Sequence, residues 1–282
     1  MAEPVPPADD LILAELPPGL DVLWGRKERG RTGPKPSLSI DTIVATAIRI
    51  ADDEGLAAVS MARLARELGF STMSMYRYVR SKDELHLLMW NSSAAGLGEI
   101  SGGTWRERLA DWAEAQRAAV LLRSWLLEMP LAAPPAGPQS LAFVEQALAA
   151  MADTPLREAE KMAVIGAVSI YSLGDARMAH QAAKAAAVTG QPEADYGAVL
   201  RTVVTADEYP ALHRLAWSPD MTARPRSEEL PPGVDQDLLG FRFGLNCILD
   251  GIQALIDRRD PTVAATGKIG GRRKSRKDGS PR

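Results

Sequence analysis

The residues with the clearest chemical potential lie between positions 60 and 82. Arginine can bind guanine through two hydrogen bonds, Ser and Thr hydroxyls can bond to several bases, and a Thr methyl group or a Met side chain can contact a thymine methyl group. A lysine ammonium group suits a phosphate better than a base edge. The segment offers such groups, with two tyrosine hydroxyls, at Ser60, Ser71, Thr72, Met73, Ser74, Tyr76, Arg77, Tyr78 and Lys82. This set predicts a surface that binds double-stranded DNA.

Two short helices around a tight turn would hold these groups in place. The apolar residues of the first helix recur at intervals of three and four, which marks one helix face: Met61, Leu64, Ala65 and Leu68. Gly69 can end this helix, because a helix C-terminus often needs a residue with positive φ. Ser71 can begin the second helix, since its hydroxyl can accept a free backbone N–H. The result is a helix-turn-helix, whose second helix enters the major groove of DNA.

The second helix divides into an inner and an outer face. Met75 and Val79 lie four residues apart and can pack inward with Phe70. A segment this short cannot also bury two tyrosines and an arginine, so we expect the hydroxyl and guanidinium groups to face outward. The periodicity alone is equally compatible with an amphipathic helical hairpin whose outer face is only solvated.

The run LARELGFSTMSMYRYVRSKDEL resembles the DNA-binding signature of the TetR family of bacterial regulators. The matching features are Leu-Ala before the glycine turn, a tyrosine six residues after Phe70, an aromatic residue two further on, and a Lys-Asp-Glu-Leu helix start. Residues 40–55 are similar to the family's first helix, so the N-terminal resemblance runs from about Ile40 to Trp90. It implies an all-α fold, in which a three-helix DNA-binding domain joins a larger helical ligand-binding and dimerisation domain.

The last expected helix carries a second resemblance. Its apolar residues recur at helical spacing: Leu238, Phe241, Leu245, Ile248, Ile252 and Leu255. FRFGLNCILDGIQALI looks like the C-terminal helix of the tetracycline-repressor branch of the family, which forms the four-helix bundle of a homodimer. Gly244 and Gly251 each cost about 1 kcal/mol relative to Ala within a helix, so the pair suggests a close helix–helix approach. The alternative is a helix buried within one chain.

The segments between these two resemblances also have helical patterns. We expect helices over 82–97, 105–127, 140–151 and 156–187, the last buried on both faces because its middle is apolar on most sides. The expected domains are a disordered leader with a basic arm (1–36), a helix-turn-helix domain with a connecting helix (37–97), a regulatory and dimerisation domain (98–259) and a basic disordered tail (260–282).

Composition favours a soluble protein of the cytoplasm. The chain has 282 residues, of which 46% are hydrophobic, enough for a small and a larger domain. It shows no signal peptide and no run of about eighteen apolar residues, so no membrane partner is expected. The single cysteine, Cys247, excludes an intrachain disulfide and fits a reducing compartment.

Charge is distributed unevenly along the chain. The net charge is −3, yet residues 26–35 carry +4, residues 268–282 carry +6 and residues 37–90 carry −1, which leaves −12 for the remainder. An acidic body would be repelled by phosphate and would leave the N-terminal part to approach DNA. The basic leader is either a solvated segment or an arm on the DNA, and the tail is either solubilising or a non-specific phosphate binder.

The sequence offers little support for catalysis. His86, His180 and His213 are the only histidines, and no two of them have metal-ligand spacing on a helix. No nucleophile elbow, phosphate loop or dinucleotide fingerprint occurs. Asp175, Arg177 and His180 stand close together and form either a polar patch in a pocket or a structural network. We therefore expect no enzyme activity, no metal and no cofactor.

The resemblance also limits the effector. Tetracycline-binding relatives hold the drug and magnesium with a His and an Asn near the start of the regulatory domain and with a later His. A gapless match puts the first two positions at Gly98 and Trp112, and no His occurs between His86 and His180, so tetracycline–magnesium is not expected. We expect an apolar or aromatic pocket, with Trp112 and Trp125 on one helix. Its candidate residues, most of which core packing would also explain, are Trp112, Gln116, Trp125, Met129, Phe143, Met162, Ile165, Ser169, Arg177 and His180.

These observations converge on a ligand-responsive transcriptional repressor. The resemblance implies a homodimer that binds a palindromic operator and that a hydrophobic small molecule releases. Two alternatives remain: a regulator with the same fold that activates or answers to no ligand, and a nucleoid-type protein that binds DNA without sequence choice.

Overall fold

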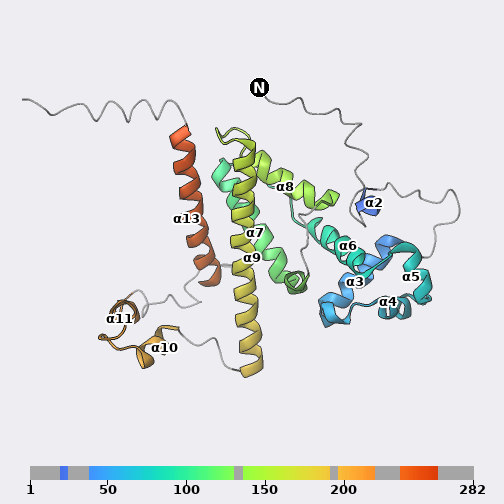
Figure 1. The fold of residues 1–282 in the computed structure, drawn as a ribbon, viewed down its shortest axis with the longest axis horizontal. Coiled ribbons are helices and arrows are strands. Elements are labelled where there is room, and N and C mark those ends of the chain that lie inside the picture. Colours follow the sequence, from blue (N-terminus) through green and yellow to red (C-terminus); the bar gives the residue numbers. More distant parts are fainter. Residues whose placement is uncertain (1–19, 25–37, 130–135, 191–195, 220–235, 260–282) are drawn as a thin grey trace, which may run out of the picture. The chain divides into compact units, whose positions relative to one another are not determined.

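The computed structural model describes residues 20–24, 38–129, 136–190, 196–219 and 236–259. Within these ranges the regular structure is entirely helical, which confirms the expected all-α fold (Figure 1). Contacts divide the chain into two compact units. Unit 1 comprises Met1–Ser101 and Leu122–Ala149, and unit 2 comprises Gly102–Leu121 and Ala150–Arg282. The predicted domain boundary at residues 97/98 stays a prediction, because this division is made on contacts alone.

The four helices of the N-terminal head are α3 (Ile40–Glu54), α4 (Met61–Leu68), α5 (Thr72–Tyr78) and α6 (Lys82–Ala94). Each begins at a serine whose hydroxyl accepts a backbone N–H of the first turn: Ser39, Ser60, Ser71 and Ser81. Ile43, Ala47 and Ile50 of α3 are fully buried and form the floor of the head. Local capping and one apolar stripe per helix are therefore sufficient to define these elements.

Unit 1 also contains a segment that lies much later in the chain than the helices of the head. The helix expected to reach residue 127 ends as α7 (Trp105–Leu122) and is followed by the 3-10 segment η2 (Ser124–Glu128). The indole N–H of Trp125 donates to Asp52 of α3 over 2.6 Å, and Arg123 lies 3.5 Å from the same carboxylate. The expectation that Trp112 and Trp125 share one helix is wrong, because this long-range contact needs the chain to turn after Leu122.

The leader is also more ordered than expected at one place. Residues Leu20–Leu23 form the short helix α2 in unit 1, where Leu20 is buried. The indole N–H of Trp24 donates to the carbonyl of Ala136 over 3.0 Å. The expectation of a disordered leader is therefore wrong for residues 20–24, while the basic arm and the C-terminal tail lie outside the described residues.

Unit 2 is built on α7, α9 (Glu158–Thr189) and α13 (Gln236–Arg259). The Tyr171 ring of α9 stacks on Phe241 of α13 with centroids 5.3 Å apart, and its hydroxyl donates to the Phe241 carbonyl. A Cβ atom added at Gly244 would collide with Tyr171, so this glycine does serve a close helix–helix approach. The smaller helices α8 (Pro138–Ala150, mostly in unit 1), α10 (Tyr196–Val203) and α11 (Pro210–Ala216) complete the described fold.

The expected burial of α9 on both faces is wrong for a single chain. Val168, Ser172 and Ala176 are buried, whereas Ile170 is 76% exposed and Met178 is 74% exposed. The sequence pattern cannot separate a face covered within the chain from a face left open, because both are equally apolar.

Helix α13 has the same mixed character. Phe241 and Leu245 are buried, whereas Phe243 is 74% exposed and Gly251 faces open space. Among the described helices, α13 is also long and apolar enough by length and composition to cross a membrane. That is weak evidence, since helices that pack within soluble proteins pass the same test.

Candidate functional site

The geometry of α4, α5 and the turn between them is that of a helix-turn-helix. Gly69 has φ 74° and ψ 28°, the left-handed conformation, and the Phe70 N–H returns to the Ala65 carbonyl over 2.8 Å. Met75 and Val79 are both fully buried and fix α5 against the head. The inward face of the second helix is therefore as predicted.

The predicted DNA-binding residues divide into those that face solvent and those that also take part in local structure. Thr72, Met73, Tyr76, Arg77 and Lys82 are exposed, with Met73 at 76%. Ser60 and Ser71 are exposed as well, although their hydroxyl groups also cap helices.

The remaining predicted residues are engaged in local structure. Ser60 accepts the Arg63 N–H over 3.2 Å, and Ser71 accepts the Ser74 N–H over 3.2 Å. The Ser71 and Ser74 hydroxyls also bond to each other over 2.9 Å, and Ser74 and Tyr78 are half-buried. The serine hydroxyls thus serve local structure in the free protein, and contact of these four residues with DNA stays a prediction.

Ion pairs neutralise arginines on α3 and α4. Glu67 accepts from Arg49 over 2.5 Å and from Arg63 over 2.8 Å, and the bond from Arg49 is the main reason that the pKa of Glu67 is lowered. Within the part of the chain that the structure describes, Lys82 at the start of α6 forms no ion pair. Its exposed ammonium group could therefore meet a phosphate backbone without first breaking a salt bridge.

His86 on α6 is a half-buried residue that sequence reasoning left without a role. Both ring nitrogens are buried and have no hydrogen-bond partner among the described residues. Burial is the main cause that lowers the pKa of His86; the nearby charge of Lys82 lowers it further, and that of Asp83 opposes the shift. The imidazole is therefore held neutral inside the head.

The predicted effector residues are divided between the two units. Trp125, Met129 and Phe143 are buried in unit 1, and the others belong to unit 2. In unit 2, Trp112 and Ile165 lie in the core, while Met162, Arg177 and His180 are at least partly exposed. The amide of Gln116 donates to the Ser169 hydroxyl over 3.4 Å. The list as a whole stays a prediction.

A buried charge pair was missed by the sequence reasoning. Arg117 is 6% exposed, its Nε donates to the Asp175 carboxylate over 2.5 Å, and its guanidinium lies 5.2 Å from the Phe241 ring centroid. Asp175 is thus part of a structural network between α7 and α9. In the same unit, the Ser172 hydroxyl and the Gln116 carbonyl are buried without a hydrogen-bond partner among the described residues.

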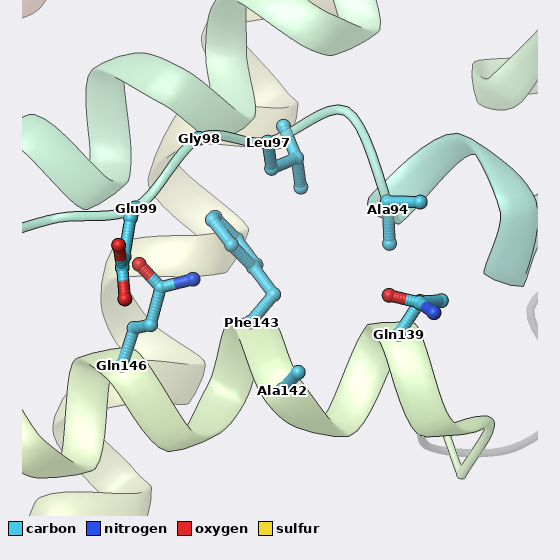
Figure 2. Close-up of a pocket in the computed structure, with 9 residues that line it drawn as sticks. Ala94, Leu97, Gly98, Glu99, Gln139, Ala142, Phe143 and Gln146 are labelled. Atoms are coloured by element: carbon cyan, nitrogen blue, oxygen red, sulfur yellow. The ribbon is translucent and has the colours of Figure 1, made fainter.

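An open cleft of about 250 Å³ lies in unit 1 between α6 and α8. Its walls are Ala94 and Ala95 at the end of α6, Leu97, Gly98 and Glu99, and Gln139, Ala142, Phe143 and Gln146 of α8. Figure 2 shows the Phe143 ring extending from α8 toward the segment that carries Leu97 and Gly98. Gln146 accepts the Ile100 N–H over 2.8 Å and ties that segment to α8. The cleft combines an apolar centre with a carboxylate and two amides at its rim.

Among the described residues, no group of three His, Cys, Asp or Glu side chains could hold a metal ion.

Comparison with known proteins identifies the family. Residues 43–88 match the family model for bacterial regulatory proteins of the tetR family, and residues 97–256 match the tetracyclin repressor-like C-terminal domain. The chain belongs to the TetR family. As a TetR-family protein it is a DNA-binding transcription regulator and not an enzyme.

Its relatives include repressors of actinobacteria. The chain is 33% identical over 247 residues to the HTH-type transcriptional repressor DrrR1 of Streptomyces coeruleorubidus, and the match covers 85% of this chain and 86% of DrrR1. Apo ActR of Streptomyces coelicolor shares the fold with a TM-score of 0.61 and 24% identity, over 84% of this chain and all of ActR. ActR in complex with actinorhodin has a TM-score of 0.62 and 23% identity, over 79% of this chain and 98% of ActR.

Proposed function

We propose that this TetR-family regulator is a repressor that binds a palindromic operator as a homodimer in the cytoplasm and that a hydrophobic small molecule releases it. The observation that carries the DNA part is the exposure of Thr72, Met73, Tyr76 and Arg77 on a helix whose opposite face is fully buried. Two such helices in a dimer would enter successive major grooves about 34–36 Å apart.

The dimer is supported by the exposed apolar residues of α9 and α13. Ile170, Met178 and Phe243 are each more than 70% exposed, although they lie on the two long helices that pack together in unit 2. A second copy would bury these side chains, and the open space at Gly251 would let another helix approach. Apolar patches on a soluble chain commonly mark such interfaces.

The effector is supported by the cleft in unit 1 and by the relatives. ActR has been crystallised in complex with actinorhodin, so actinorhodin is the first probe that we would use for this chain. Gly98, where the resemblance would place a tetracycline-binding His, lines the cleft without offering a metal ligand. We infer that the effector is mainly apolar or aromatic, lies against Phe143 and bonds to the amides at the rim.

The decisive experiment is selection of bound DNA from a random pool, followed by release with a small molecule. Repression predicts one palindromic sequence that is bound 10³–10⁷-fold more tightly than random DNA, roughly the range of specific regulators. An effector should weaken this binding by about 5–150-fold and should itself bind more weakly to the operator complex by the same factor. Isothermal titration calorimetry would measure its binding, because no tryptophan lines the cleft.

Other outcomes of that experiment would favour the alternatives. A pool that yields no preferred sequence would indicate a nucleoid-type binder, whose affinity depends on salt rather than on sequence. A specific operator with increased transcription on binding would indicate an activator of the same fold.

A further inference from the structure

The first turn of α8 is capped by a residue from a different helix. Asn91 of α6 is 6% exposed, and its Oδ1 accepts the backbone N–H groups of Gln139 over 3.0 Å and Ser140 over 3.3 Å. Free N–H groups in the first turn are usually satisfied by a Ser, Thr, Asp or Asn directly before the helix. Here that position is Gly137, and the cap comes from 48 residues away.

Gly137 is required by this arrangement. A Cβ atom added at Gly137 would collide with the carboxamide of Asn91. A capping side chain at position 137 and the Asn91 cap therefore exclude each other. Glycine at position 137 leaves room for the Asn91 side chain. The capping contact joins α6 and α8 more specifically than apolar packing would, because two N–H groups converge on one oxygen atom.

The same two helices line the cleft. Ala94 and Ala95 follow Asn91 by one helical turn, and Gln139, whose N–H Asn91 holds, lines the cleft together with Ala142 and Phe143. Figure 2 shows Ala94 opposite Gln139, at the end of the cleft near the first turn of α8. A molecule in the cleft would therefore contact both α6 and α8, and these two helices are linked by the hydrogen bonds of Asn91.

Helix α6 leads from this joint into the head. Leu85 and Met89 of α6 are fully buried, and the helix packs on α3, which forms the floor of the head. Because packed helices move as rigid bodies, a shift of α6 at Asn91 would reach the head near Lys82. A ligand changes DNA affinity only if it favours one of two such arrangements.

We propose that Asn91 is a positioning residue that transmits occupancy of the α6–α8 cleft to the DNA-binding head through its cap on α8. Gly137 makes the cap possible, and Asp52 of α3 makes a second long-range contact in the same unit through Trp125 and Arg123. This inference rests on the proposed function, and it names the joint by which the effector cleft would control DNA binding.

An aromatic group attached covalently within the cleft can test the role of Asn91 without knowledge of the natural effector. In a Cys247→Ser background, Ala142→Cys would be labelled with N-phenylmaleimide, which places an aromatic group in the cleft. Glu145→Cys is the matched control, because Glu145 lies on the same helix and does not line the cleft. Affinity is measured for the operator selected by the unmodified chain.

We expect the label at Ala142→Cys to weaken operator binding by about 5–150-fold, and the label at Glu145→Cys to change it by less than about twofold. Adding Asn91→Ala should reduce the effect of the Ala142→Cys label to within about twofold, because the label is attached to α8 and the first turn of α8 is then no longer bonded to α6. Asn91→Asp keeps the acceptor at a helix N-terminus and should retain the full effect.

The inference is wrong if the label at Ala142→Cys leaves operator affinity unchanged, or if Asn91→Ala leaves its effect intact. Thermal melts monitored by circular dichroism show whether Asn91→Ala is folded. If it is not, Gly137→Ala displaces the Asn91 carboxamide without removing it and should uncouple the label in the same way. Failure of the unmodified chain to select any operator would instead overturn the proposed function.

Discussion

The DNA-binding head and the pair of long helices α9 and α13 complete their cores differently. In the head, Met75, Val79, Leu85 and Met89 are all fully buried, and the large apolar side chains left exposed are those of the reading helix α5. On α9 and α13, Ile170 and Phe243 are more than 70% exposed. The head is thus complete within one chain, whereas the long helices leave apolar surface exposed, which the proposed dimer would cover.

The polar contacts show the same contrast. The head helices are capped by neighbouring serines, so their geometry follows from a few consecutive residues. Unit 2 relies on pairs distant in sequence, such as Arg117 with Asp175 and Arg242 with Glu114, the latter over 2.7 Å. A change at one of these caps therefore acts on a single helix end, whereas a change in a unit 2 pair acts on the packing of whole helices.

The largest expected effect is on dimerisation, for a substitution on the exposed apolar face of α13. Phe243→Glu places a charge on the exposed face of α13, and a buried interface would have to desolvate it. We expect the dimer dissociation constant to rise by roughly 30- to 1000-fold, equivalent to about 2–4 kcal/mol for a central aromatic residue. Sedimentation equilibrium at several concentrations measures it.

Leu122→Glu is the control for that measurement. Leu122 is 82% exposed but lies at the end of α7, outside the long-helix pair. The control should leave the dissociation constant unchanged. A Phe243→Glu chain that stays dimeric at the same concentrations would mean that the exposed face of α13 is not the interface.

Substitutions at two of the three glycines of α13 should give the next largest effect. Gly244→Ala should destabilise the chain by about 1–3 kcal/mol, because the new methyl group would collide with Tyr171, whose ring stacks on Phe241. Gly251→Ala meets no atom within 4 Å and should not lower protomer stability, whereas a bulkier Gly251→Leu should weaken the dimer. Urea unfolding measures the first difference, and equal midpoints for the two Ala variants would show that Tyr171 adapts.

The sequence predicted the head more completely than the regulatory part. The Gly69 turn, the caps at Ser60 and Ser71, and the burial of Met75 all depend on residues within a few positions of one another. The connecting helix begins at Lys82 as expected but ends at Ala94, before the expected residue 97. The end of α7 at Leu122 depends on Trp125 and Asp52, which are 73 residues apart. The periodicity also predicted that α9 is apolar on most sides. Whether each apolar face is buried depends on which other helices pack against it, and the pattern of α9 does not contain that information.

The candidate site follows the same division. The exposed reading face of α5 could be predicted because a seven-residue helix has room for only one buried face. The cleft could not, since its walls come from two helices and a connecting segment that only the fold brings together. Asn91 gave no sequence signal either, because its nearer partner, Gln139, lies 48 residues away.

Within the head, the DNA contacts of the exposed residues can be tested with operators that differ at single base pairs. Arg77→Ala should reduce discrimination at one or two base pairs by about 1–3 kcal/mol if the guanidinium binds a base edge. Lys82→Ala should weaken all sequences alike and reduce the salt slope by about one unit. Binding titrations against operator variants at several salt concentrations measure both effects. Unchanged relative affinities in Arg77→Ala would assign Arg77 to the DNA backbone.

The smallest expected effect tests whether the head is closed around a neutral imidazole. Burial lowers the pKa of His86 in the folded chain, so the unfolded chain, with a pKa near about 6.5, binds more protons between the two values. Stability should therefore fall as the pH drops through about 6.5 toward the folded pKa, and should be fully present above about pH 6.5.

His86→Gln keeps a polar side chain of similar length without this titration. Melting temperatures of both proteins between about pH 8 and about pH 5 should diverge, with the larger decrease in the unmodified chain. Carboxylates elsewhere titrate in both proteins, so only the difference between the two curves reports His86. Parallel curves would show that water reaches the ring and that the head is less tightly closed at α6 than its burial indicates.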